Sequence, residues 1–511
     1  MQNNDKKVLL RISNLKQYFP LKGGRFVKAN DGITLDIYEG ETFGLVGESG
    51  CGKSTLGRTI LQLYHQTYGR TMYYGRSLDD LAPKYVIDTV RNLKARRTKL
   101  RELEQKRDKL EADYAKLSEK EQYAKHGELD AARKLAEDAL LDITKIVGGF
   151  LVVDDLDPVI AAYSKDYAIA RKLSSMEEKR QELQVDVDDA EYAKKTAEEA
   201  GKSGKDAQLQ KAQEKLKQCD DQIAALRAQL DAGRKEIEAL RAPYANDPEF
   251  QKYEAYRDDG IDLARLEYNE MRRLRRDMQL IFQDPYSSLN PRMSVGQIIS
   301  EGMQAHNMIK KKDARMQEMV LKIMDDCGLA PYFLHRFPHQ FSGGQRQRIG
   351  IARALATKPK FVVCDEAVSA LDVSIQAQII NLLLDLKEQQ NLTYMFITHD
   401  LSVVKYISDR VGVMYLGTMV ELAAADEIFH HPIHPYTEAL LNAIPTTDTV
   451  GAKELSILEG DIPSPVNPPK GCKFHTRCKY CTEICTQVVP EWEEVRPNHF
   501  VACHHKLEAK E

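Results

Sequence analysis

Apolar residues recur with a seven-residue period in the middle of the chain. One seam comprises Leu209, Leu216, Ile223, Leu230 and Ile237, and a second seam, three positions later, comprises Ala212, Cys219, Leu226 and Leu240, with only Gly233 out of character. Such a pattern, sustained over several heptads, is typical of a coiled coil.

A weaker seam with similar spacing lies upstream, at Leu93, Leu100, Leu103, Leu110, Tyr114 and Leu117. Between the two seams, residues 148–163 read GGFLVVDDLDPVIAAY, which is apolar and less helical. We therefore predict an antiparallel coiled-coil hairpin with this stretch as its tip. The alternative is a pair of solvated helices that bridge neighbouring elements.

The patterns divide the chain into four predicted parts. Residues 1–80 are β-rich with a phosphate-binding turn, 81–261 form the helical insertion, 262–430 resume a globular pattern, and 431–511 are a tail rich in Pro, His and Cys. The apolar runs KFVVCDE and TYMFITHD agree with a parallel sheet flanked by helices, hence an α/β fold.

Charge and hydropathy narrow the class of protein. The net charge of −4 argues against nucleic-acid binding, which normally needs a basic surface. No apolar run approaches the roughly 20 residues that span a bilayer, and the first residues lack a secretory signal. We therefore expect a cytosolic chain whose role at a membrane would depend on partners.

The clearest chemical motif is a P-loop. It follows the apolar run ETFGLV and precedes LGRTILQLY, and it comprises Gly47, Glu48, Ser49, Gly50, Cys51, Gly52, Lys53, Ser54 and Thr55. Glycines let backbone N–H groups converge on phosphates, Lys53 adds a positive charge, and Ser54 offers an oxygen to Mg²⁺. This motif predicts a site for ATP.

Two further motifs complete the chemistry. The run FVVCDE ends a predicted strand in Asp365, which would organise Mg²⁺ through water, and Glu366, which would act as general base. Ser342, Gly343, Gly344 and Gln345 open a predicted helix and form a second anion-binding device.

Together, these motifs resemble the nucleotide-binding domain of ABC ATPases. The resemblance implies a RecA-like core with antiparallel β and α-helical subdomains, and a dimer in which SGGQ grips the γ-phosphate held by the other subunit. It implies that Gln283 is the Q-loop glutamine and a Mg²⁺ ligand, that His399 is the switch histidine, and that Asp372 closes the D-loop. Phe19, or its neighbour Tyr18, would stack on adenine.

The tail narrows the resemblance. The segments HPIHPYTEALLNAIP and EGDIPSPVNPPKGCKFHTRC, with IFQDPYSSLNPRM in the core, are similar to oligopeptide/dipeptide transporter ATPases. This implies a peptide importer at the cytoplasmic face of the membrane. Its partners would be two permeases, a homologous ATPase or a second copy, and an external peptide-binding protein. A transporter for another solute, such as a nickel chelate, would use a similar ATPase subunit.

Five of the nine cysteines fall in the tail. Cys472, Cys478, Cys485 and Cys503 match a family pattern that in some members ligates an iron–sulfur cluster. Zinc also suits four thiolates, and unmetallated thiols are the third alternative. Cys481 adds a CxxC with Cys478 and complicates the choice of ligands.

The insertion has no counterpart in the family pattern, and we expect it to project without disturbing catalysis. A coiled coil within an ABC ATPase also suggests the chromosome-maintenance class. There, however, the coiled coil follows the Q-loop glutamine, whereas here it precedes Gln283. Translation-associated relatives carry two cassettes, whereas this chain has one P-loop and one SGGQ.

Overall fold

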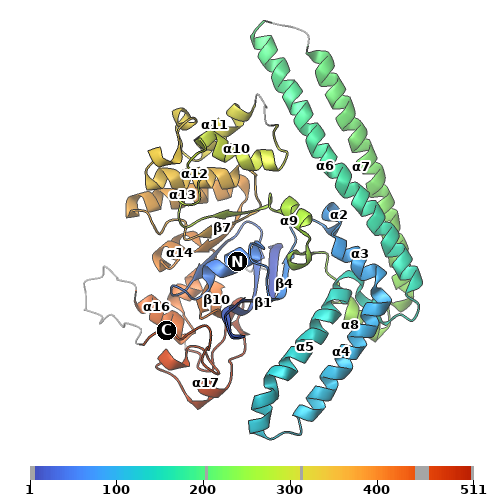
Figure 1. The fold of residues 1–511 in the computed structure, drawn as a ribbon, viewed down its shortest axis with the longest axis vertical. Coiled ribbons are helices and arrows are strands. Elements are labelled where there is room, and N and C mark those ends of the chain that lie inside the picture. Colours follow the sequence, from blue (N-terminus) through green and yellow to red (C-terminus); the bar gives the residue numbers. More distant parts are fainter. Residues whose placement is uncertain (1–5, 202–204, 311–314, 444–459, 508–511) are drawn as a thin grey trace. The chain divides into compact units, whose positions relative to one another are not determined.

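The computed structural model describes residues 6–201, 205–310, 315–443 and 460–507. The chain divides into two compact units, one made of Met1–Gly75 with Arg272–Glu511 and the other of Arg76–Met271. We call them the cassette unit and the helical unit (Figure 1). Among the described residues, no helix is both long enough and apolar enough to cross a bilayer.

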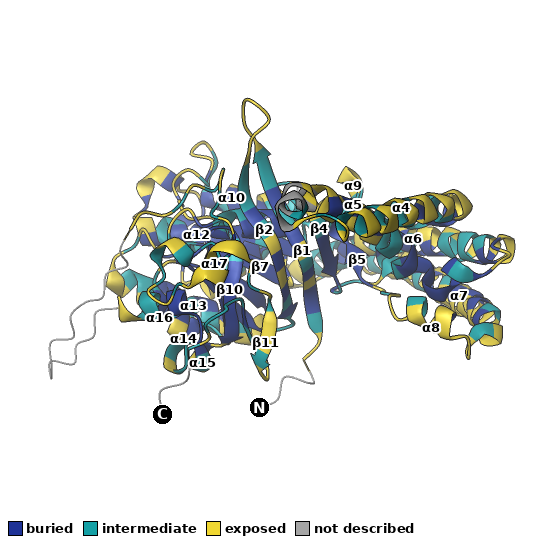
Figure 2. Ribbon diagram, turned by 90° about the horizontal axis from the view of Figure 1, so that it is seen from below, coloured by how far each residue is buried: buried dark blue, intermediate teal, exposed yellow. Residues whose placement is uncertain are grey.

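An eight-stranded sheet forms the centre of the cassette unit. Its order is β11 (Glu493–Arg496), β12 (His499–Val501), β10 (Thr418–Ala424), β9 (Arg410–Tyr415), β3 (Thr42–Val46), β8 (Thr393–Ile397), β7 (Phe361–Asp365) and β6 (Met278–Ile281). The five strands from β9 to β6 are parallel. Every residue of β3, β7 and β8 is buried, as their mostly apolar sequences require. Figure 2 shows β7 in the colour of buried residues.

A smaller antiparallel sheet in the same unit has β1 (Val8–Pro20) between β2 (Phe26–Tyr38) and β4 (Tyr68–Tyr73). Helix α1 (Lys53–Ile60) contacts strands of both sheets. The RecA-like core and the antiparallel β subdomain are therefore present as the sequence predicted.

Helices of the cassette unit form one hydrophobic core with residues of the parallel strands β6, β7 and β8. They are α10 (Val295–Ala305), α11 (Met316–Asp326), α12 (Gly343–Leu355), α13 (Val373–Gln390) and α14 (Leu401–Ile407). Residues such as Ile299, Met324 and Ile349 are fully buried among them. The C-terminal region adds α15 (Ala425–His430), α16 (Pro435–Asn442) and α17 (Glu483–Gln487).

The two chain segments that flank the helical unit meet in the cassette unit. The Lys360 ammonium donates to the carbonyl of Gly75, and the Lys360 backbone N–H donates to the carbonyl of Asp277 at 2.8 Å. The Tyr73 hydroxyl donates to the Asp277 carboxylate at 3.1 Å. The chain thus leaves the cassette fold and returns to it at neighbouring points.

The helical unit consists of two hairpins. The shorter pairs α4 (Leu93–Tyr114) with α5 (Glu119–Val147), and the longer pairs α6 (Asp157–Glu199) with α7 (Asp206–Arg241) (Figure 1). The unit also contains α2 (Leu78–Leu81), α3 (Lys84–Arg91), α8 (Pro248–Glu254) and β5 (Ile261–Asp262). Its last residue, Met271, lies within α9 (Tyr268–Leu274). Short 3-10 turns complete the chain: η2 (Gly148–Val152), η3 (Ala242–Tyr244), η4 (Leu263–Arg265), η5 (Pro331–Phe333), η6 (Pro338–Gln340) and η7 (His475–Arg477).

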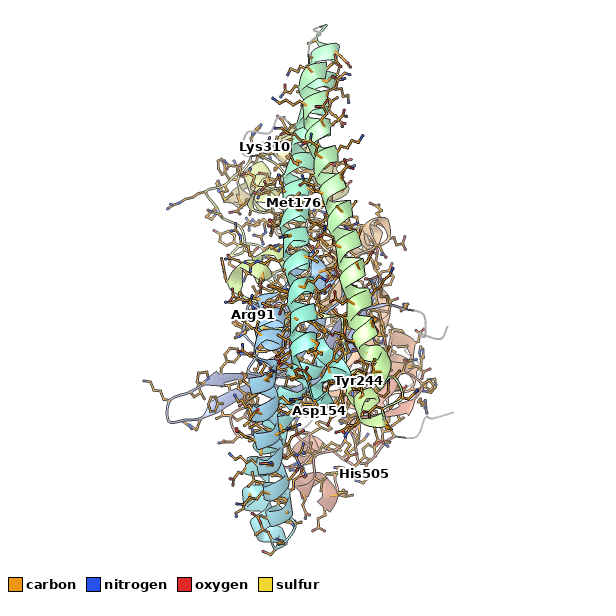
Figure 3. The ribbon with its side chains drawn as sticks, turned by 90° about the vertical axis from the view of Figure 1, so that its right-hand side faces the viewer. Arg91, Asp154, Met176, Tyr244, Lys310 and His505 are labelled. Carbon is orange, nitrogen blue, oxygen red and sulfur yellow. The ribbon has the colours of Figure 1, made fainter. Side chains whose placement is uncertain are left out.

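The prediction of a single hairpin with its tip at residues 148–163 is wrong. This stretch joins the two hairpins at their shared base, where Phe150 is fully buried with Leu93, Val147 and Phe250. Figure 3 shows Asp154 and Tyr244 near the same end of the α6–α7 pair, with Met176 farther along it. An exposed tip would leave the apolar run FLVV in water, whereas a base buries it.

The seams themselves are placed on packed faces. Cys219, Ile223, Leu230 and Ile237 of α7 are buried, as the heptad predicts. Gly233 faces α6, where a Cβ atom would lie 2.9 Å from the Asp166 carboxylate. The upstream seam packs against α5 rather than against α7.

Candidate functional site

The P-loop joins the buried strand β3 to helix α1, as the sequence predicts. Gly47 has φ +149° and Gly52 has φ +103°. A Cβ atom at Gly47 would lie 2.2 Å from the Met414 carbonyl, and one at Gly52 would lie 2.2 Å from the Ala29 carbonyl. Both backbone conformation and space therefore require glycine at these two positions.

Beside the loop lies a cavity of about 400 Å³ within the cassette unit. That volume lies in the range of about 300–1,000 Å³ that small-molecule sites occupy. Its lining residues are Phe19, Val27, Lys28, Ala29, Ser49, Gly50, Cys51, Gly52, Lys53, Ser54, Thr55, Gln283, Glu366, Leu416, Gly417 and Pro465. The lining thus brings Ser49–Thr55 of the predicted P-loop together with the predicted Q-loop glutamine and general base, whereas Gly47, Glu48, Asp365 and His399 do not line it.

Lys53 is nearly fully buried and folds back over the loop. Its ammonium donates to the carbonyls of Gly47 at 2.6 Å and Glu48 at 3.0 Å. A phosphate oxygen entering the cavity would replace these carbonyls as the partner of a cation that is already positioned.

Asp365 stands at the end of β7 and links that strand to α1. Its carboxylate accepts from the Ser54 hydroxyl at 2.5 Å and from the Arg58 guanidinium at 3.1 Å. Mg²⁺ prefers oxygen ligands and keeps several for water and substrate phosphates. The hydroxyl of Ser54, the carboxylate of Asp365 and the nearby amide of Gln283 therefore fit such an ion. Arg58 was not singled out from the sequence, because nothing in its spacing distinguishes it from an exposed helical arginine.

Three predicted catalytic residues meet at one edge of the parallel sheet. The Gln283 amide donates to the Glu366 carboxylate at 2.6 Å, and His399 Nδ1 lies 3.5 Å from the other carboxylate oxygen. Gln283, Glu366 and His399 lie within two residues of the ends of β6, β7 and β8, which are neighbours in the sheet. The carboxyl ends of parallel strands are where ligands bind in open α/β sheets.

Of the two aromatic candidates for adenine, only Phe19 lines the cavity. Its ring packs edge-on against Tyr64, with 5.3 Å between the ring centres. The Tyr18 hydroxyl instead donates to Asp31 at 2.5 Å, and burial raises the pKa of Tyr18. The structure therefore favours Phe19 over Tyr18.

The predicted residues of the second phosphate device do not line this cavity. Ser342 caps α12 and accepts from the Gln345 N–H at 3.4 Å, while Gln345 closes the capping box in return. Asp372 caps α13 and accepts from the Ile375 N–H at 3.0 Å. Gly344 is buried against Ile375, whereas Ser342, Gly343 and Asp372 are exposed and free to meet another surface.

The tail cysteines share one neighbourhood without forming a metal site. The Cys472 N–H donates to the Cys485 carbonyl at 2.8 Å. Burial, followed by smaller effects that include the neighbouring thiols, raises the pKa of Cys472 to about 11 and that of Cys503 to about 12. Within the described part of the chain, no group of three or more Cys, His, Asp or Glu side chains is arranged to hold a metal ion. The predicted ligands Cys472, Cys478, Cys485 and Cys503 are thus close together in the described tail, but they are not arranged as a metal site.

Comparison with known families gives two matches. The family described as ABC transporter matches residues 30–251 and 251–369, and the family described as oligopeptide/dipeptide transporter, C-terminal region, matches residues 420–485. The first spans well over half of the chain.

Curated proteins similar in sequence to this chain agree with the two family matches. The oligopeptide transport ATP-binding protein AppF of Bacillus subtilis is 52% identical over 250 residues, which cover 48% of this chain and 75% of AppF. A putative peptide import ATP-binding protein of Brucella ovis is 54% identical over 245 residues, covering 48% of this chain and 77% of the relative. The putative oligopeptide transport ATP-binding protein YkfD of Bacillus subtilis is 34% identical over 498 residues, covering 97% of this chain and 95% of YkfD.

Among solved structures, a post-hydrolysis dimer of an ATP-binding cassette bound to ADP and phosphate matches with a TM-score of 0.42 and 15% identity, over 82% of this chain and 99% of that one. The family matches and the relatives decide the assignment: the chain belongs to the ABC transporter family, in the branch that carries the oligopeptide/dipeptide transporter C-terminal region.

Proposed function

We propose that this chain is the ATP-hydrolysing subunit of an ABC importer that takes up peptides. The observation that carries the proposal is one cavity that gathers the P-loop, Gln283 and Glu366 in a chain with the oligopeptide/dipeptide C-terminal region. The relatives AppF and YkfD are named for oligopeptide transport, which supports peptides as the cargo.

Each site residue has a proposed role. Lys53 and the loop N–H groups bind the β- and γ-phosphates, and Phe19 stacks on adenine. Ser54, Asp365 and Gln283 hold Mg²⁺, which neutralises phosphate charge when bound. Glu366 accepts a proton from the attacking water, and His399 contacts the γ-phosphate.

Hydrolysis requires a second cassette in this proposal. Ser342, Gly343 and Asp372 are exposed and lie outside the cavity of their own chain, and with Gln345 they would reach the γ-phosphate bound by the partner. The partner is either a homologous ATPase or a second copy of this chain. The dimer works at the cytoplasmic face of the membrane on two permeases, and through them with an external peptide-binding protein.

Two features of the chain have proposed structural roles. The α6–α7 pair forms an antiparallel coiled coil, supported by its heptads and buried seam. Cys472, Cys478, Cys485 and Cys503 hold an iron–sulfur cluster, or zinc, only after their thiols ionise and move together. Metal analysis of anaerobically purified protein tests this assignment, and the absence of both iron and zinc would reject it.

Two experiments test the function. The tagged chain, purified from detergent-solubilised membranes, should bring down two multi-span permeases, and recovery of DNA-processing or ribosomal proteins instead would refute the importer. Glu366→Gln should retain ATP binding, stabilise the dimer and lower turnover by roughly 10²–10⁴-fold. The matched change Asp385→Asn, on the exposed face of α13, should leave turnover unchanged.

A further inference from the structure

Glu48, in the middle of the P-loop, is held at three points. Its backbone N–H donates to the Tyr436 hydroxyl at 2.9 Å, and its carbonyl accepts from Lys53 at 3.0 Å. Its carboxylate receives two hydrogen bonds from the guanidinium of Arg477, at 2.7 and 3.0 Å. Two of the three contacts come from the C-terminal region, about 390 and 430 residues away in sequence.

Arg477 sits in a built site rather than on the surface. Its side chain is only 4% exposed, and that of Glu48 is 22% exposed. The guanidinium lies over the Tyr415 ring, 5.9 Å from its centre, and donates to the Tyr415 hydroxyl at 3.5 Å. Tyr415 in turn packs against Tyr436 and Phe474, with ring centres 4.8 and 5.2 Å apart. A two-pronged guanidinium–carboxylate pair held by packed rings fixes direction as well as charge.

The same C-terminal segment touches the cavity at two more points. Pro465 lines it, and the Pro465 carbonyl accepts from the Lys28 N–H at 3.1 Å. The Lys473 ammonium donates to the Asp31 carboxylate and to the Leu416 carbonyl, both at 3.2 Å. Residues 465–477 therefore contact the P-loop at Glu48 and strand β2 at Lys28 and Asp31.

The charge of Glu48 explains why this contact matters for the nucleotide. A carboxylate within a loop that binds phosphates repels them, and the repulsion is strong where water is partly excluded. Arg477 pairs with that carboxylate and neutralises its charge, and Glu48 is not among the residues that line the cavity. We propose that Arg477 is a positioning residue for nucleotide binding, so that the C-terminal segment forms part of the ATP site; this rests on the proposed ATPase function.

The test is a double-mutant cycle on the full-length chain, with Mg-ATP as the ligand. Arg477→Met leaves Glu48 unpaired and should raise the KM for ATP by roughly tenfold while changing kcat by less than about twofold. Glu48→Gln removes the repulsive charge, leaves the positive charge of Arg477 near the phosphates, and should lower the KM for ATP. The double variant should return KM to within about threefold of the wild-type value. Arg496→Met, at an exposed arginine of the same region, is the matched control and should not change KM.

Two outcomes overturn the proposal. One is a KM for Arg477→Met within twofold of the wild-type value. The other is a double variant as weak as Arg477→Met, because lost packing rather than an unpaired charge would then explain the defect. If Arg477→Met does not fold, Glu48→Gln decides, since weaker ATP binding by that variant also contradicts the proposal. Binding of a fluorescent ATP analogue, measured without turnover, separates the two hypotheses: a wild-type chain that binds no nucleotide refutes the proposed function instead.

Discussion

Replacing Phe150 tests the internal architecture of the helical unit. The Phe150 ring is fully buried where the two hairpins join, and it meets the rings of Phe250 and Tyr163 edge-on, with centres 5.7 and 6.2 Å away. The guanidinium of Arg241 lies 4.9 Å from the centre of the same ring. Phe150→Ala removes all of these contacts at once.

The expected loss follows from that environment. Truncating a buried phenylalanine to alanine costs about 3–5 kcal/mol of unfolding free energy, and the edge-on rings with the cation–π contact place this site in the upper part of that range. We expect a loss of about 4 kcal/mol for Phe150→Ala and about 1 kcal/mol for Phe150→Leu, which keeps most of the volume. Leu135→Ala, at a leucine that is 54% exposed on α5, is the control and should change stability by less than about 0.5 kcal/mol.

Hydrogen exchange on the full-length chain is the suitable assay, because it resolves the two units separately. A loss of about 4 kcal/mol should speed exchange of the slowest amides in 93–114 and 157–199 by roughly a thousandfold. Exchange in 361–397 of the cassette unit is the internal reference. If Phe150→Ala changed exchange no more than Leu135→Ala does, the 148–163 stretch would not be a core and the reasoning would fail.

Three further predictions follow from burial and connectivity. Burial raises the pKa of Asp166 to about 6, above its unfolded value, so its carboxylate is unfavourable above that pH. After allowance for partial exposure, Asp166→Asn should stabilise the helical unit by up to ~1 kcal/mol at pH 8 and by almost nothing at pH 4. The control Glu191→Gln, at an exposed residue, should not stabilise the unit at either pH. Equal shifts of the melting temperature of Asp166→Asn at both pH values would contradict this prediction. Burial lowers the pKa of His434 to about 4, so the unfolded state binds one more proton than the folded state between that pH and about 6.5. The free energy of unfolding should therefore fall by up to ~3 kcal/mol as the pH drops from about 6.5 to 4. A urea midpoint, followed by Trp492 fluorescence, that did not fall over this window would refute the prediction. Replacing 76–271 by a short Gly/Ser linker should preserve ATP binding, because the flanking segments meet at one point, and loss of nucleotide binding by a folded product would contradict this.

The sequence predicted that Gln283, Glu366 and His399 would lie close together, because these residues are tied to strand ends. Each of the three lies within two residues of the end of an apolar strand, and parallel strands bring such positions to one edge. The sequence could not decide whether Phe19 or Tyr18 is the ring that stacks on adenine. Both rings occupy one strand, and two features of the structure separate them: Phe19 lines the cavity, and the Tyr18 hydroxyl donates to Asp31.

The heptad pattern of the sequence could not predict which helices pair with each other. A heptad tells which face of a helix is apolar, but not which helix covers that face. The seam that begins at Leu93 was assigned to the wrong partner because α5 buries small residues such as Ala132 and Ala136, which blur its apolar stripe. The contact of Arg477 with Glu48 was equally invisible, since the pairing depends on how the tail folds back on the cassette.

The order of strands in the large sheet has a consequence for synthesis on the ribosome. Strand β3, which leads into the P-loop, pairs with β8 and β9. Thr42 therefore has no partner until Tyr394 has been synthesised, and Phe43 also pairs with Arg410. At about 5–20 residues per second, that interval lasts roughly 20 to 70 s. During it the apolar strand Thr42–Val46 has no partner and is a natural target for chaperones, whereas residues 76–271 already carry all the helices of their own core. The helical unit is therefore positioned to fold first, as the nascent chain grows, and the nucleotide site to assemble only near the end of translation.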